Sequence, residues 1–459
     1  MQSVQSKNGY AMTAAACIWL GLFPLLQAGT YAHITHDKWI IMLILTGVTL
    51  LCFLTDMIAV PLIRRIRSRN TQCDIGDAGE ASPRRSMVPV ILASGLLLWT
   101  VLSCFLSPYD PNICLLGEGT RYEGLISQLC YFTLFYLFFF SRVSRKPLLI
   151  STAAGVLVFL IIVVLQRAGG NPLGLYPSGR SYSTNPEFQG TIGNIDMNTG
   201  YLLIVSGILL YGFCDPFIIP GTSKLSFRLD AKKEWKKLSV AVICLIGLII
   251  SIYLIISMDV QFGVIGLAVL FLFSFLRFLP AKWRLPLLIL LIVLALLAVW
   301  FWPGYGGGLW ELHEILHGRT RLSFGSNRIA VWAYCLGFAK EHLFFGGGSG
   351  AFRIYFNQYL SDNSLVIPTE QDGLQLPAFF DTAHNEYIAQ LTDHGLPAAL
   401  LFLALILVAL FRRREGWFPC LSSCSAAVLC YAVQAFFSFS VCIVAPMFWV
   451  VLALSFSEE

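Results

Sequence analysis

Apolar runs dominate the pattern along this chain. About twelve of them approach the roughly 17 to 25 residues that a helix needs to cross a bilayer. They lie at about 11–28, 40–63, 87–106, 124–141, 148–166, 199–219, 238–257, 263–279, 285–302, 396–411, 421–439 and 441–456. Backbone polar groups inside lipid must be paired within the segment, so each run predicts a helix. The expected fold class is therefore all-α, a polytopic membrane protein with about 12 transmembrane helices.

One long polar stretch, residues 303–395, interrupts this pattern. It is predicted to be a single large, mostly helical extracytoplasmic loop. The expected organisation is residues 1–302 with helices one to nine and short loops, residues 303–395 as the loop that carries the active site, and residues 396–459 with helices ten to twelve. A membrane protein that keeps one large loop with an arginine, a glycine run and a histidine is expected to do its chemistry there.

Composition and charge support this picture and orient it. The chain is 57% hydrophobic and 12% charged, which excludes a soluble domain. Basic residues gather in connections at 64–85, 142–146, 224–237, 282–284 and 412–414. With twelve helices these connections share one side, which the positive-inside rule makes the cytoplasm. The protein is expected in the cytoplasmic (inner) membrane with both termini cytoplasmic, and the net charge of +5 does not indicate nucleic acid.

The loop should contain two helices around a glycine run. Ser326 is expected to cap the first helix, on which Arg328 and Trp332 are i,i+4 neighbours whose planes can stack. Ser349 is expected to cap the second helix. The glycine run at 346–350 lacks the Lys-Ser or Lys-Thr of a nucleotide-binding loop, so a helix-joining turn is the better interpretation.

A third helix is predicted to begin at Asp381 or Thr382 and to end before Gly395. His384 would then lie in its first turn, where the helix dipole disfavours a positive imidazolium, whereas Asp381 favours one, so the direction of the pKa shift stays open. A neutral imidazole can act as a general base. Asp393 follows about half a turn out of phase and is not expected to orient His384.

His313-Glu314-Ile-Leu-His317 is a literal HExxH pattern on a short predicted helix. Zinc peptidases use this spacing to place two ligands and a glutamate base on one helix. A third ligand would have to come from Glu341, Glu386 or His384. A membrane zinc metallopeptidase is therefore one alternative function, and amphipathic packing with incidental histidines is the competing interpretation.

Several motifs together resemble the O-antigen ligase and polymerase superfamily. These are Arg328-Ile-Ala-Val-Trp332, the glycine-rich stretch 346–352, and His384 followed nine residues later by Asp393-His-Gly395. Residues 119–124 and 190–194 also fit. Members of this superfamily are membrane glycosyltransferases that use polyprenyl-diphosphate-linked glycans.

The resemblance implies transfer of a glycan from a polyprenyl-diphosphate donor to an acceptor hydroxyl on the outer side of the cytoplasmic membrane. The catalytic candidates are His384, as base, and Arg328. Candidates for substrate binding are Arg121, Arg319, Arg321, Trp332, Asn385 and Asp393. The acceptor would be a lipid, a glycan or a protein, and ligase and polymerase activities both remain open. Membrane lipid is an expected partner and nucleic acid is not.

No metal or other cofactor is expected, because arginine suits the growing charge of a diphosphate and no outer Asp-x-Asp pair occurs. The nearest approach is Glu370-Gln-Asp372.

The chain departs from the superfamily pattern at residues 258–263, where Gln261 stands in place of an expected arginine, and at Asp393, where glutamate is usual. A second alternative, a polysaccharide flippase or transporter, rests on Asp56, an acid inside the second predicted helix.

Overall fold

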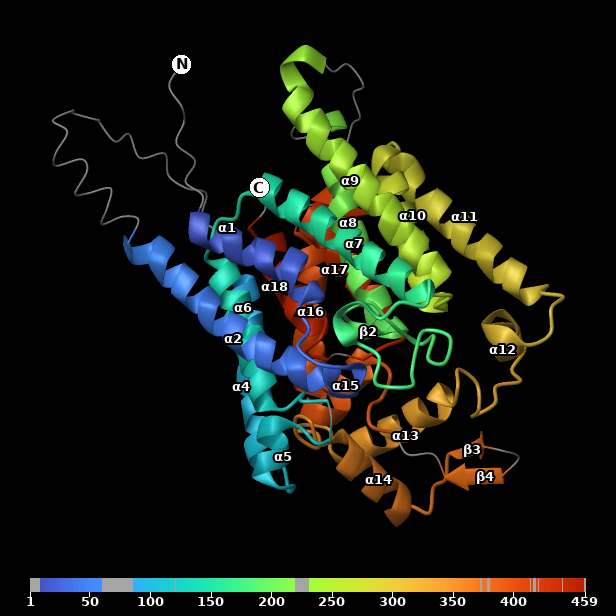
Figure 1. The fold of residues 1–459 in the computed structure, drawn as a ribbon. Coiled ribbons are helices and arrows are strands. Elements are labelled where there is room, and N and C mark those ends of the chain that lie inside the picture. Colours follow the sequence, from blue (N-terminus) through green and yellow to red (C-terminus); the bar gives the residue numbers. More distant parts are fainter. Residues whose placement is uncertain are drawn as a thin grey trace.

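The computed structural model describes most of the chain as a helical bundle (Figure 1). The described residues are 9–59, 86–119, 121–218, 231–371, 374–377, 380–412, 414–415, 418–419, 421–439 and 441–457. The basic connections at 64–85 and 224–230, and Asp372, lie outside them.

Seven helices among the described residues are long and apolar enough to cross a membrane. They are Tyr31–Ile58, which contains α2 (Ile34–Leu54), α4 (Val88–Leu106), α7 (Arg145–Arg167), Ile195–Phe217, which contains α8 (Ile195–Cys214), α9 (Ala231–Ser257), α10 (Gln261–Phe278) and α11 (Ala281–Trp300). The protein is therefore a polytopic membrane protein, as predicted.

Five shorter apolar helices accompany them. They are Tyr10–Leu25, which begins with α1 (Tyr10–Cys17), α6 (Leu125–Phe139), α16 (Leu396–Phe411), α17 (Ser423–Gln434) and α18 (Ala445–Ser455). Each of the twelve predicted spans overlaps one of these longer or shorter helices. Because the shorter ones fall below the usual crossing length, the number twelve stays a prediction.

Short strands qualify the all-α class. The described residues contain three two-stranded antiparallel sheets. They pair β1 (Phe188–Gln189) with β2 (Gly193–Asn194), β3 (Pro368–Gln371) with β4 (Leu374–Pro377), and β5 (Arg414–Glu415) with β6 (Phe418–Pro419). The β3–β4 hairpin lies in the loop, which is therefore mostly but not wholly helical.

Helix α8 is the most enclosed of the long helices, with 89% of its apolar window buried. It packs against α7, α9 and α17. Gly207 allows the close approach to α17: a Cβ at this position would lie 2.5 Å from the backbone nitrogen of Ala427. Small residues serve helix packing in membranes in this way, because lipid offers no hydrophobic driving force between helices.

We expect Gly207→Ala to destabilise the protein by about 1 to 3 kcal/mol, because its new methyl group meets backbone rather than a movable side chain. Gly47→Ala in α2 is the matched control, since a Cβ at Gly47 would meet nothing within 4 Å. Thermal unfolding in detergent should show a lower midpoint for Gly207→Ala alone. Equal midpoints for the two variants would contradict the close α8–α17 packing.

The remaining described α-helices lie in the segments between the apolar helices. They are α5 (Pro111–Leu116), α12 (Gly307–Leu316), α13 (Arg328–Glu341), α14 (Phe352–Asp362) and α15 (Glu386–His394). Helices α13 and α14 and the β3–β4 hairpin lie together at one end of the bundle (Figure 1).

The predicted serine caps are wrong. Helix α13 begins after Asn327, and both Ser326 and Asn327 have positive φ, so the extended geometry of a capping serine is absent. Helix α14 begins after Ala351, two residues later than a Ser349 cap requires. The Ser349 hydroxyl instead lies 2.7 Å from His394 Nε2.

The predicted start of the third helix is also wrong. Helix α15 begins at Glu386, and the Asn385 side chain caps it by accepting a hydrogen bond from the Ile388 N–H at 3.1 Å. His384 precedes this cap with φ +48, so it lies outside the helix. The first-turn dipole argument for its protonation therefore does not apply.

The glycine run is a helix-joining turn, as predicted, and it also caps α15. The N–H groups of Gly347 and Gly348 donate to the carbonyls of Thr392 and Asp393, both at 2.8 Å. These carbonyls belong to the last turn of α15, where partners inside the helix are missing. A Cβ on Gly346 would lie 2.5 Å from the Thr392 oxygen, so glycine is required for this approach.

Candidate active site

His384, which lies just before helix α15, has largely apolar surroundings. Its ring meets those of Phe380 and Phe439 edge-on, with centroids 6.3 and 5.1 Å apart. Its Nδ1 is buried and has no hydrogen-bond partner among the described residues. Burial lowers the pKa of His384 to about 4, and the positive charge of Arg328 adds to this shift. The imidazole is therefore neutral at pH 7 and able to accept a proton.

Arg121 reaches the site from the segment between α5 and α6. Its Nε and Nη2 donate to one oxygen of Asp381 at 2.8 and 2.7 Å. Its guanidinium also lies over the ring of Phe439, 4.3 Å from the centroid. Phe439 thus contacts both Arg121 and His384, and the structure brings these two predicted residues together.

Arg328 stands at the first position of α13, and its charge acts on both His384 and Asp196. Its Nη1 donates to the Gly325 carbonyl at 3.2 Å. Its Nε is buried without a partner among the described residues. The guanidinium therefore keeps hydrogen-bonding capacity that the described part of the chain does not use.

The predicted stacking of Arg328 on Trp332 is wrong, because no contact joins the guanidinium to the indole ring of these two described residues. Its indole Nε1 donates to the Ala383 carbonyl at 2.9 Å, and its ring meets Phe436 edge-on. The indole therefore holds the backbone of Ala383, the residue before His384. It does not hold the Arg328 guanidinium.

Asn385 is buried and Asp393 is half-buried, and the side chains of both make hydrogen bonds within the protein. Asn385 caps α15, which is a structural task. Asp393 accepts a hydrogen bond from the Tyr355 hydroxyl, and its pKa is raised to about 7 by burial. Asp393 pairs with Tyr355, and no hydrogen bond joins it to His384 among the described residues. The helical-spacing argument itself does not apply, because His384 lies outside α15.

Arg319 and Arg321 are held near α12 rather than beside His384. Arg319 donates from Nε and Nη2 to the two carboxylate oxygens of Glu314, at 2.9 and 2.6 Å. Arg321 lies over the ring of Trp310, 5.8 Å from its centroid. No contact joins either of these described arginines to Arg121 or Arg328.

The HExxH residues are engaged in packing around α12. His313 Nδ1 lies 3.0 Å from the Val299 carbonyl, and His317 Nδ1 lies 2.8 Å from the His313 carbonyl. Glu314, which would be the base, is paired with Arg319. Over the described ranges, no group of three or more His, Cys, Asp or Glu side chains could hold a metal ion. The three nominated third ligands therefore do not complete this motif.

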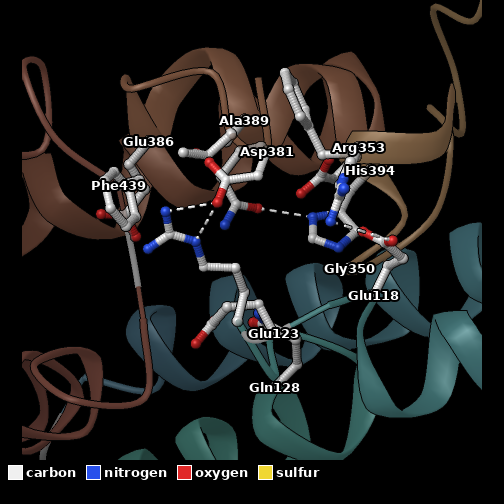
Figure 2. Close-up of a pocket in the computed structure, with 15 residues that line it drawn as sticks. Glu118, Glu123, Gln128, Gly350, Arg353, Asp381, Glu386, Ala389, His394 and Phe439 are labelled. Carbon is white, nitrogen blue, oxygen red and sulfur yellow. Dashed lines mark hydrogen bonds and ion pairs between the residues drawn. The ribbon is translucent and has the colours of Figure 1, made fainter. Parts of the chain in front are cut away.

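A pocket of about 660 Å³, part of it open to solvent, adjoins the site. Figure 2 shows Phe439 and Asp381 on one side of it, Arg353, His394 and Glu118 on the other, and Glu123 with Gln128 below. Its lining residues are Glu118, Arg121, Glu123, Gln128, Gly350, Phe352, Arg353, Asp381, Thr382, Glu386, Ala389, Gln390, Asp393, His394 and Phe439. Arg121 and Phe439 thus form a wall that the pocket shares with His384.

Four further residues of this region were not predicted to belong to the transferase site, although Glu386 was considered as a possible zinc ligand. Glu123 and Glu386 stand inside the two motifs that contain Arg121 and His384, so motif membership could have indicated them. Asp196 at the start of α8 and Phe439 after α17 carry no such signal. They join the site only through tertiary packing.

The fold and the site define a polytopic membrane protein with a centre of histidine and arginine side chains. A family model described as O-antigen ligase matches residues 246–403, so this part of the chain is similar to that family. The match contains Arg328 and His384, whereas Arg121 lies outside it. The resemblance seen in the sequence is confirmed for this region. No curated protein matches the chain.

Titration of labelled histidine by NMR in nanodiscs tests the state of His384. We expect its ring signals not to titrate between pH 5.5 and 8, because burial and Arg328 keep the pKa near 4. Arg328→Gln should raise this pKa by removing a positive charge. Asp381→Asn should lower it further by removing the charge that favours the imidazolium.

His384→Gln assigns the signal among the seven histidines. A wild-type midpoint near pH 6.5, or shifts of the same sign in the two charge variants, would contradict this electrostatic description.

Proposed function

We propose that this chain transfers a glycan from a polyprenyl-diphosphate donor to an acceptor hydroxyl on the outer side of the cytoplasmic membrane. The observation that carries the proposal is the half-buried His384, whose Nδ1 is buried and without a partner among the described residues, lying within the electrostatic influence of Arg328 and Arg121. A proton acceptor beside fixed positive charge suits a reaction that deprotonates a hydroxyl and expels an anion.

The proposed reaction is a single displacement. The acceptor oxygen attacks the anomeric carbon, its proton passes to His384, and the bond from that carbon to the diphosphate oxygen breaks. The polyprenyl diphosphate leaves with the bonding electrons. The anomeric centre is inverted because the new bond forms opposite the one that breaks.

The two arginines are assigned different tasks. Arg328 faces the leaving diphosphate, because its charge lacks a bonded carboxylate and its Nε is unpartnered among the described residues. Forked guanidinium donors suit phosphate oxygens. Arg121 is already bound to Asp381 and Phe439, so it positions the wall beside His384 and contributes less charge.

The other candidates take supporting roles in this proposal. Trp332 and Asn385 hold the backbone on either side of His384. Asp393 lines the adjoining pocket. Arg319 and Arg321 are placed outside the site because Glu314 and Trp310 bind them.

The proposed arrangement in the membrane keeps residues 303–395 outside and both termini in the cytoplasm, on the charge asymmetry of the loops. The donor lipid approaches laterally between helices. The transferred group comes from a lipid-linked glycan, and the acceptor is a lipid, a glycan or a protein. Arginine charge takes the place of a metal ion in this mechanism.

No observation favours the transporter alternative. The Asp56 carboxylate accepts hydrogen bonds from the N–H groups of Ala11 and Met12 at 3.2 and 2.8 Å. These are N–H groups of the first turn of α1, which have no partners inside the helix. Asp56 therefore caps a helix end, which accounts for an acid at this position.

His384→Ala and Arg328→Ala should each lower glycan transfer by about 100-fold or more, as expected when a general base or a charge partner is lost. His313→Ala and Glu314→Gln should retain near-normal transfer. The measurement is surface glycan attachment in a deletion strain complemented with each variant, with membrane amounts matched by immunoblot. In the empty strain, unattached full-length polymer indicates a ligase and single repeat units indicate a polymerase.

Normal surface glycan in the His384→Ala strain would refute the proposed base. Loss of activity in His313→Ala, together with about one bound zinc per wild-type chain, would favour the peptidase instead.

A further inference from the structure

The pocket beside His384 carries many polar groups but little net charge. Arg121 is paired with Asp381, and Arg353 lies 3.8 Å from Glu118, so each cation faces an acid. A diphosphate needs an excess of positive charge, which these pairs do not supply. The occupant of this pocket is therefore expected to be uncharged.

Three further carboxyl groups line the pocket, and a tyrosine hydroxyl binds each of them. Tyr131 donates to Glu123 and Tyr431 donates to Glu386, both at 2.8 Å. Asp393 accepts a hydrogen bond from the Tyr355 hydroxyl. Burial raises the pKa of Glu123 to about 8 and those of Glu386 and Asp393 to about 7. Near neutral pH these groups are substantially protonated, so they add hydrogen-bonding capacity more than charge.

Unused hydrogen-bonding atoms and two aromatic rings complete the lining. Oε2 of Glu118 and Oε2 of Glu123 are buried without a partner among the described residues. Gln128 contributes an amide, and Phe352 and Phe439 contribute apolar surface. An apolar ring face surrounded by donors and acceptors matches a pyranose, which has C–H faces and a rim of hydroxyl groups.

We propose that this pocket is a sugar-binding subsite that accepts one uncharged pyranose ring. The shared wall of Arg121 and Phe439 would place that ring next to His384. The ring belongs either to the donor glycan or to the acceptor glycan. Either glycan would present the same C–H face and hydroxyl groups to the pocket. Its connection with transfer rests on the proposed function, whereas binding itself does not.

Binding is tested with the full chain in nanodiscs by saturation-transfer NMR. The probes are the methyl glycosides of glucose, galactose and N-acetylglucosamine, with methyl glucuronide as the charged comparison. We expect saturable binding of at least one uncharged glycoside, weaker binding of the glucuronide, and unchanged binding in His384→Ala.

Two lining variants should weaken that binding at least five-fold. Gln128→Leu keeps the side-chain size but removes its hydrogen bonds, and Ala389→Leu fills space in the pocket. Gln358→Leu is the matched control, because Gln358 is an exposed glutamine on α14 outside the lining. Thermal unfolding of each variant separates a lost site from a lost fold, and Glu123→Gln, which keeps a neutral polar group, should still bind.

Three results would overturn the subsite: no saturable binding of any uncharged glycoside, a preference for the glucuronide, or equal binding in folded Gln128→Leu and Gln358→Leu.

The source of the ring is assigned with donor and acceptor extracted from the deletion strain. A raised KM in Gln128→Leu for one substrate alone identifies the glycan that carries the ring. Unchanged KM values for both, despite lost glycoside binding, would overturn the link with transfer. Glycoside binding by a wild-type chain that transfers nothing would refute the proposed function and leave the subsite standing.

Discussion

Helix α15 is fixed at both ends by hydrogen bonds, and the position of His384 depends on this. At its start the Glu386 N–H donates to the Ala435 carbonyl at 2.8 Å, and Asn385 caps the first turn. At its end the glycine turn donates to the last carbonyls. Ser103 of α4 also donates to the Asp393 carbonyl at 2.7 Å. His384 lies one residue before the capped end, so its backbone has little freedom to move.

This anchoring explains how a side chain in an irregular segment can be preorganised. A non-glycine residue with positive φ is uncommon and persists where its surroundings hold it. Around His384, Trp332 binds the preceding carbonyl and Phe439 packs on the ring. Burial then sets the protonation state. The same packing separates a region of excess positive charge at Arg328 from a polar pocket of little net charge beyond Arg121.

The sequence predicted the features that depend on residues close together in the chain, and it did not predict those that depend on distant contacts. Apolar run length predicted the membrane helices, because crossing lipid requires a minimum length of helix whatever the neighbours are. Motif order predicted His384, Arg328 and Arg121 as outer candidates. The errors at Ser326 and Ser349 are local: both serines sit beside turns whose positive φ values only the folded chain reveals. The β3–β4 hairpin was hidden in a stretch without helical or alternating periodicity.

Long-range partners were out of reach for a different reason. Asp381 and Phe439 reach Arg121 from sequence separations of hundreds of residues, and pattern within one segment contains no information about such contacts. The HExxH pattern shows the opposite case, in which a local pattern is correct but the tertiary contacts do not support a site. Its spacing is correct, but Glu314 is bound by Arg319 and a third ligand is missing from the described part of the chain. A local motif therefore needs its tertiary partners before it defines a site.

The most direct measurement uses the purified full chain in nanodiscs with the extracted polyprenyl-diphosphate glycan and acceptor, in the presence of a chelator. The proposed mechanism predicts joined glycan and free polyprenyl diphosphate in equal amounts, both absent with His384→Ala. Joined glycan that forms equally well with His384→Ala, or only after a divalent metal is restored, would contradict it.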